Sequence, residues 1–77
     1  MSVLFVLITC DVGSEKSVIA KLKTINSVKD VNQVWGSYDI LVKLKGNNSD
    51  DLKNIVTSQI RKISDISTSL TLTAIES

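Results

Sequence analysis

The residues of this 77-residue chain best suited to chemistry lie in one short run: Gly36, Ser37, Tyr38 and Asp39. Gly-Ser between two strand-like runs is typical of a two-residue hairpin, because glycine tolerates the positive φ of a type II′ turn. Tyr38 and Asp39 then follow as a hydroxyl and a carboxylate side by side. Turn N–H groups could face the carboxylate of a small zwitterion, with Asp39 on its ammonium group. The alternative is an ordinary hairpin in which these residues only shape the turn.

Further polar and aromatic side chains could line the same pocket. Ser69, Thr71 and Thr73 alternate along the last strand-like segment, so their hydroxyls should share one face. Hydroxyls both donate and accept hydrogen bonds, which suits a polar ligand. Threonine is also common in strands for its β-branching alone. Trp35, the single tryptophan, could form a pocket wall, pack at a strand end or anchor a subunit contact.

Catalysis and metal binding find little support in the residue types. Histidine is absent, which removes the commonest general base and the commonest metal ligand. Cys10 is the single cysteine, so it can form neither an internal disulfide nor a thiolate metal site alone. We interpret it as a small core residue in a reducing cytoplasm. Without a glycine-rich phosphate loop or paired acids at metal-ligand spacing, we expect no enzyme, no cofactor and no metal.

Composition and charge indicate one globular domain over residues 1–77. The chain is 43% hydrophobic and 22% charged, and nine basic against eight acidic residues give a net charge of +1. These charges are interspersed, so no basic stripe is available to a nucleic-acid backbone. The apolar run 3–8 lacks a basic flank and is far shorter than the roughly 20 residues of a membrane span. We therefore expect neither direct DNA binding nor membrane insertion.

Six segments must position the candidate side chains. Residues 3–10 are apolar at alternate positions on both sides, as expected of a strand buried on both faces. Apolar residues at helical spacing predict a helix over 14–25 capped by Ser14, and a second helix capped by Ser49. Alternation and turn signals predict three further strands, over residues 28–35, 40–45 and 66–75.

The order of these segments, strand-helix-strand-strand-helix-strand, predicts an α+β ferredoxin-like fold. Right-handed crossovers then give a four-stranded antiparallel sheet with both helices on one face. The other face of such a sheet is open, yet the strand over 3–10 is apolar on both sides. A second copy of the same sheet is the simplest cover. We therefore predict at least a dimer that packs through the open sheet face.

Three parts of the chain together match a known pattern. The run 34–39 leads into an apolar strand, Asp50-Asp51-Leu52 opens a helix, and residues 60–66 lead into residues 68–71. With the order of elements, they resemble the effector-binding (RAM) domain of the Lrp/AsnC transcriptional regulators. The resemblance covers essentially the whole chain. Its glycine-x-tyrosine-aspartate element is moderately specific alone and more specific in this order of elements.

The resemblance implies a domain that binds small molecules, usually amino acids. It also implies homodimers joined through their sheets and assembled into rings, commonly octamers or decamers, with ligands between dimers. Gly36, Tyr38 and Asp39 match the family motif and would be site residues. Thr71 matches a threonine that is common in the last strand of the family, and Ser69 stands where a second threonine often occurs. Two departures are Trp35, where threonine is frequent, and Asp65, where glycine frequently precedes the last strand.

Members of that family usually carry a helix-turn-helix domain upstream, whereas here the first strand follows Met1 directly. We therefore expect a stand-alone, cytoplasmic RAM domain that could modulate full-length regulators by co-assembly. Two alternatives stay open. One is a structural module in which the turn is an assembly contact and the pocket is vestigial. The other is a small enzyme of the dimeric α/β-barrel type, against which the lack of histidine counts.

Overall fold

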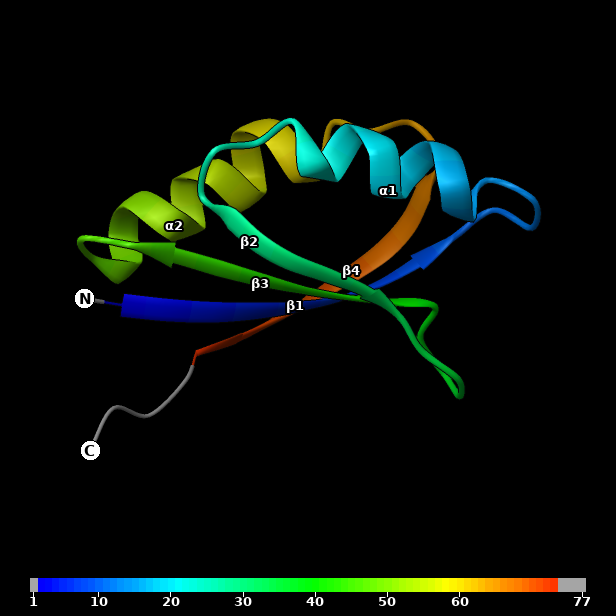
Figure 1. The fold of residues 1–77 in the computed structure, drawn as a ribbon, viewed down its shortest axis with the longest axis horizontal. Coiled ribbons are helices and arrows are strands. Elements are labelled where there is room, and N and C mark those ends of the chain that lie inside the picture. Colours follow the sequence, from blue (N-terminus) through cyan, green and yellow to red (C-terminus); the bar gives the residue numbers. More distant parts are fainter. Residues whose placement is uncertain (1, 74–77) are drawn as a thin grey trace.

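Four strands and two main helices make up the part of the chain that the computed structural model describes, which is the backbone of residues 2–73 and the side chains of residues 2–72. Their order along the chain is the predicted one (Figure 1). The elements are β1 (Ser2–Cys10), α1 (Glu15–Lys23), β2 (Val28–Gln33), β3 (Ile40–Gly46), α2 (Ser49–Ile55), the π-helical turn η1 (Val56–Ile60) and β4 (Ile66–Thr73). The end of the predicted strand, residues 74–75, lies outside the described residues.

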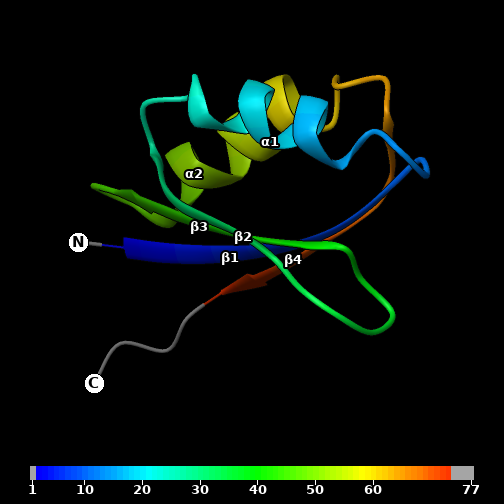
Figure 2. The ribbon, with the colours of Figure 1, turned by 45° about the vertical axis from the view of Figure 1, so that its right-hand side comes forward.

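The four strands form one sheet in the order β2-β3-β1-β4, and every neighbouring pair is antiparallel. Both helices lie on the same face of this sheet (Figures 1 and 2). This is the ferredoxin-like arrangement that the order of segments predicts, with β2 and β4 as edge strands. None of the helices described has the length and apolar character that a bilayer crossing requires.

The core lies between the helices and the covered face of the sheet. Alternate residues of the central strands point into it, because successive side chains of a strand face opposite sides. The helices contribute one apolar stripe each. The buried residues are Leu4, Val6, Ile8, Val18, Leu22, Ile25, Ile40, Val42, Leu44, Leu52, Val56 and Ile60.

No helix covers the other face of the sheet (Figure 2). That face carries apolar side chains. Phe5 and Leu7 of β1 alternate with the buried residues of that strand, and β4 places Leu72 beside Phe5 and Leu70 beside Leu7. Leu41 of β3 also pairs with Leu7. We call these five residues the open-face patch. The predicted two-sided apolar character of the first strand is confirmed, and Leu70 and Leu72 stay 43% and 45% exposed.

The first helix is shorter than predicted, at Glu15–Lys23 instead of residues 14–25. Ser14 is the N-cap residue as predicted, but its side chain makes no capping hydrogen bond. The Glu15 carboxylate instead turns back and accepts from the Gly13 N–H at 3.0 and 3.2 Å. This bond places a negative charge at the helix N-terminus, where the helix dipole favours it.

The N-cap of α2 is Asn48 and not Ser49 as predicted. Asn48 has extended backbone angles, and its Oδ1 accepts from the Asp51 N–H at 2.8 Å. Its Nδ2 also donates to the Asp51 carboxylate at 3.0 Å. Both residues are common caps, so composition could not separate them. The backbone decides, because Ser49 is already helical.

We expect Asn48→Ala to lower the free energy of unfolding by about 1 kcal/mol, because the substitution leaves the Asp51 N–H without its capping acceptor. Ser49→Ala is the matched control and should change the free energy of unfolding by only about a few tenths of a kcal/mol. Urea denaturation of the two variants and the wild type measures the difference. A larger loss from Ser49→Ala would contradict the observed cap.

Candidate ligand-binding site

The segment 34–39, which joins β2 to β3, is a wider loop than the predicted two-residue hairpin. Strand β2 ends at Gln33, two residues earlier than predicted, and β3 begins only at Ile40. The Val34 N–H donates to the Asp39 carbonyl at 2.8 Å and closes the loop. Gly36 has φ of +122°, a conformation that glycine adopts without strain. The glycine thus has the positive φ that the sequence predicts, but in a different turn.

Asp39 ties this loop to the central strand. Its N–H donates to the Ile8 carbonyl at 2.9 Å, and its Oδ2 accepts from the Cys10 N–H at 3.0 Å. These two contacts explain the wide loop, because they hold Asp39 against β1 before β3 begins. One carboxylate oxygen is therefore used within the chain. Oδ1 has no hydrogen bond among the described residues.

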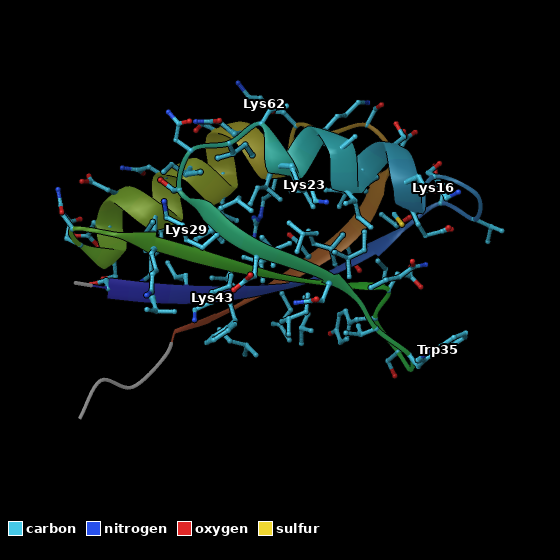
Figure 3. The ribbon with its side chains drawn as sticks, viewed as in Figure 1. Lys16, Lys23, Lys29, Trp35, Lys43 and Lys62 are labelled. Atoms are coloured by element: carbon cyan, nitrogen blue, oxygen red, sulfur yellow. The ribbon has the colours of Figure 1, made fainter. Side chains whose placement is uncertain are left out.

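The other residues of the loop lie around its exposed tip. Gly36 and Ser37 are exposed, whereas Tyr38 is half-buried. Trp35 projects from the loop with its side chain fully exposed (Figure 3). With Gln33 and Val34 it lines a small cleft of about 180 Å³ that includes neither Tyr38 nor Asp39. Within one chain, Trp35 is therefore not a wall of a pocket around those two residues.

Ser69 and Thr71 lie on the helix-covered side of the edge strand β4. They pair with Ile8 and Val6, whose side chains are buried beneath the helices. Leu70 and Leu72 alternate with them and face the open side. The two hydroxyl residues therefore share a face, as the alternation predicts. The side chain of Thr73 lies outside the described residues.

Two clefts adjoin this strand, and we call them together the β4-edge groove. One has a volume of about 390 Å³ and is lined by Lys53, Val56, Thr57, Arg61 and Thr71. The other has about 380 Å³ and is lined by Arg61, Ile66, Ser67, Thr68 and Ser69. A wider cleft of about 510 Å³ lies elsewhere, at Lys29, Asp30, Lys43, Lys45, Gly46 and Asn47, and includes none of the predicted site residues.

The predicted site residues thus fall into two places within one chain. The loop 36–39 contacts β1 from the β3 side, whereas Ser69 and Thr71 lie on β4, across β1 from it. No cleft described in the chain includes residues from both groups. Lys53 and Arg61, which also line the β4-edge groove, were not among the predicted site residues. Their spacing with Thr57, at four-residue intervals along one helix, is the signal that could have indicated a shared side.

Comparison with known proteins decides the family. Residues 3–77 match the model of the "Lrp/AsnC ligand binding domain" family. The chain belongs to the Lrp/AsnC ligand-binding domain family. Among solved structures, FFRP-DM1 is similar, with 35% sequence identity and a TM-score of 0.91 over 97% of this chain and 100% of that one. The family resemblance and the ferredoxin-like fold inferred from the sequence are therefore confirmed.

Two longer proteins contain a similar part. Homocitrate synthase of Saccharolobus islandicus is 42% identical over 55 residues, which are 71% of this chain but 12% of the enzyme. The chain therefore spans about an eighth of that relative. The transcriptional regulator NMB0573 of Neisseria meningitidis, solved as a complex with L-Met, has a TM-score of 0.87 at 9% identity, over 97% of this chain and 50% of the regulator. That last likeness shows the fold alone.

In this Lrp/AsnC domain, Cys10 lies among acidic residues at the end of β1. Burial raises the pKa of its thiol, and nearby negative charges raise it further, in the order Asp39, Glu15, Asp11 and Asp65. A raised pKa means less thiolate at neutral pH, and the thiolate is the reactive form. No group of three or more His, Cys, Asp or Glu side chains within residues 2–72 is arranged to hold a metal ion.

We therefore expect Cys10 to react with iodoacetamide more slowly at neutral pH in the folded domain than in the urea-unfolded chain. The reason is that unfolding removes both the burial and the fixed carboxylates that disfavour the thiolate. Mass spectrometry of alkylated protein over time measures the two rates. Equal rates in the two states would show that the surroundings of Cys10 do not protect the thiol.

Proposed function

We propose that this domain is an effector-binding and oligomerisation module whose ligand is an amino acid or a similar small polar molecule. The observation that carries the proposal is the match to a ligand-binding family over residues 3–77. NMB0573, a regulator that shares this fold, was solved with L-Met, so the fold can hold an amino acid in that protein. The same family match argues against the small-enzyme alternative.

We place the effector at the loop 36–39, with Tyr38 and Asp39 as its polar contacts. The Oδ1 atom of Asp39 can accept a hydrogen bond from the ammonium group of an amino acid. The N–H groups of the loop can donate hydrogen bonds to its carboxylate. Because Ser69 and Thr71 lie across β1 from this loop, a site that uses both groups needs residues of a second copy. The full exposure of Trp35 suits the same arrangement, since exposed tryptophans are frequent anchors in interfaces.

We propose that two copies associate through the open-face patch and that these dimers form a ring. The patch is apolar on three neighbouring strands, β3, β1 and β4, and an apolar area of this kind favours burial against another protein surface. A second copy offers an identical surface, which a two-fold axis can bring face to face. Octamers or decamers are the ring sizes that the family resemblance implies.

The regulatory role that we propose is co-assembly in the cytoplasm with longer proteins that carry the same module. Homocitrate synthase of Saccharolobus contains a segment matching 71% of this chain, and NMB0573 shares the fold over half its length. A copy of this domain could pair with such a module through the sheet face and so bring effector binding to it.

A purely structural module is the second candidate function, and one observation favours it. The Asp39 carboxylate already serves the backbone of Cys10, so its placement has a structural reason without any ligand. In that case the loop would be an assembly contact and no effector would bind.

Isothermal titration calorimetry of the wild-type protein against each standard amino acid separates the two candidates. The effector-binding function predicts saturable heat for at least one of them, with native mass spectrometry showing the bound mass on the assembly. If no amino acid gives heat and the assembly is intact, the structural function stands and the effector proposal is wrong.

A further inference from the structure

The β4-edge groove has a lining of one electrostatic sign. Lys53 and Arg61 contribute two positive charges, and none of the groove residues is acidic. Among the described residues, the ion pair that forms is Lys21 with Asp65, at 4.0 Å. No carboxylate described therefore lies within ion-pair distance of Lys53 or Arg61. A groove with unneutralised cations attracts a negatively charged ligand.

Hydroxyl groups complete this lining on both sides of Arg61. Thr57 and Thr71 lie in one cleft, and Ser67, Thr68 and Ser69 lie in the other. The Ser67 hydroxyl donates to the Asp11 carboxylate, and the hydroxyls of Thr57 and Thr68 are also bonded within the chain. Among the described residues, the Ser69 and Thr71 hydroxyls make no such bond, so these two can donate hydrogen bonds to an anion. Since Ser69 and Thr71 are half-buried on the β4 edge, they lie at the inner side of the groove.

The helical wall of the groove has an unusual backbone. Residues Val56–Ile60 form a π-helical turn, and the Arg61 N–H donates to the Val56 carbonyl at 2.9 Å, five residues earlier. The Thr57 hydroxyl donates to the Lys53 carbonyl at 3.1 Å, one turn before. Val56, Thr57 and Arg61, which lie at and just after this turn, line the same cleft. Short π-helical segments occur frequently at functional sites.

We propose that the β4-edge groove binds the carboxylate group of a small organic acid, with Arg61 as its main anchor. The planar guanidinium can give two parallel hydrogen bonds to a carboxylate, which an ammonium group cannot. The hydroxyls of Thr71 and Ser69 flank it on the strand side. This site goes beyond the effector site proposed at residues 36–39, because it lies across β1 and is complete within one chain.

Calorimetric titration of the full chain with glutarate, a small dicarboxylate, tests the proposal. Glutarate should bind saturably, whereas its uncharged diamide should not bind. Arg61→Gln should weaken glutarate binding by about tenfold or more, since a hydrogen bond between charged groups is lost. Arg61→Lys keeps the charge but not the fork geometry, so it should give an intermediate loss. Circular dichroism checks that each variant is folded.

The matched control is Lys62→Gln, which removes the same charge one residue away. Lys62 lies on the outer side of the helical layer (Figure 3) and does not line the groove. This variant should bind glutarate as the wild type does. Three results would overturn the site: unchanged binding in Arg61→Gln, an equal loss in Lys62→Gln, or equal binding of the diamide. Inorganic phosphate binding as tightly as glutarate would overturn the assignment to carboxylates.

Failure of this inference is distinguishable from failure of the proposed function. Heat with amino acids but none with glutarate would leave the effector function standing and exclude the groove site. Heat with glutarate alone, lost in Arg61→Gln, would support the groove site without the amino-acid effector.

Discussion

Substituting lysine for both Leu70 and Leu72 is expected to convert the proposed dimers into monomers. Each leucine is a little under half exposed in the single chain and lies opposite Leu7 or Phe5 on the open-face patch. Burying a leucine fully contributes about 1.5–3 kcal/mol relative to leaving it exposed. Because each of these leucines is already partly buried, an interface gains only the fraction of this energy that belongs to its exposed surface. In a two-fold interface every substitution occurs twice. A desolvated lysine charge adds a further cost of several kcal/mol when it lacks a partner.

The loss of assembly can be read by light scattering after size exclusion, at micromolar protein. The double variant should stay folded by circular dichroism, because neither leucine belongs to the core beneath the helices. Val12→Lys is the matched control. Val12 is fully exposed in the loop between β1 and α1, away from the open-face patch, so its variant should keep the wild-type mass. A folded wild-type monomer at this concentration would refute assembly through the sheet.

Replacing Asp39 should have different effects on stability and on binding, depending on the substitution. Asp39→Ala is expected to lower the free energy of unfolding by about 1–3 kcal/mol, because the part-buried Cys10 N–H loses its acceptor. Asp39→Asn keeps an oxygen at that place and should cost clearly less. Urea denaturation measures both values. Equal losses in the two variants would show that the charge, and not the hydrogen bond, stabilises the loop.

The asparagine variant is also the better test of effector binding, since the fold and assembly are expected to persist. If Asp39 pairs with an ammonium group, Asp39→Asn should weaken amino-acid binding by about tenfold or more, as loss of a charge-assisted contact does. Calorimetry on the amino acid that binds the wild type gives the ratio. Wild-type affinity in Asp39→Asn would assign Asp39 to the structure of the loop alone.

Much of the fold was predictable because its signals are local. The alternation of apolar residues in 3–10 and 40–45 reports directly which side chains share a face. The helical spacing in the two helices does the same, and together these patterns predict both the covered core and the open-face patch. The caps were less predictable. Asn48 and Ser49 are adjacent residues with similar capping chemistry, and only the backbone angles distinguish them.

The candidate site was predictable only in part. The positive φ of Gly36 follows from residue type, but the width of the loop follows from the bonds of Asp39 to Ile8 and Cys10, about thirty residues earlier. The only sequence signal for Arg61 was its four-residue spacing from Thr57. Its place opposite Ser69 and Thr71 depends on a π-helical turn and on β4 lying at the sheet edge.

The sequence by itself therefore determined the elements, the two faces of the sheet and the family to which this chain belongs. The elements and the two sheet faces follow from the types of side chains that lie close together in the sequence, because local sterics and the burial of alternate apolar residues fix them. Only the tertiary structure decided which polar side chains share a surface. It places β1 between the loop 36–39 and β4, and so separates the loop from Ser69 and Thr71 while bringing those two beside Arg61. Strand order is set by contacts between distant segments, which no local pattern records.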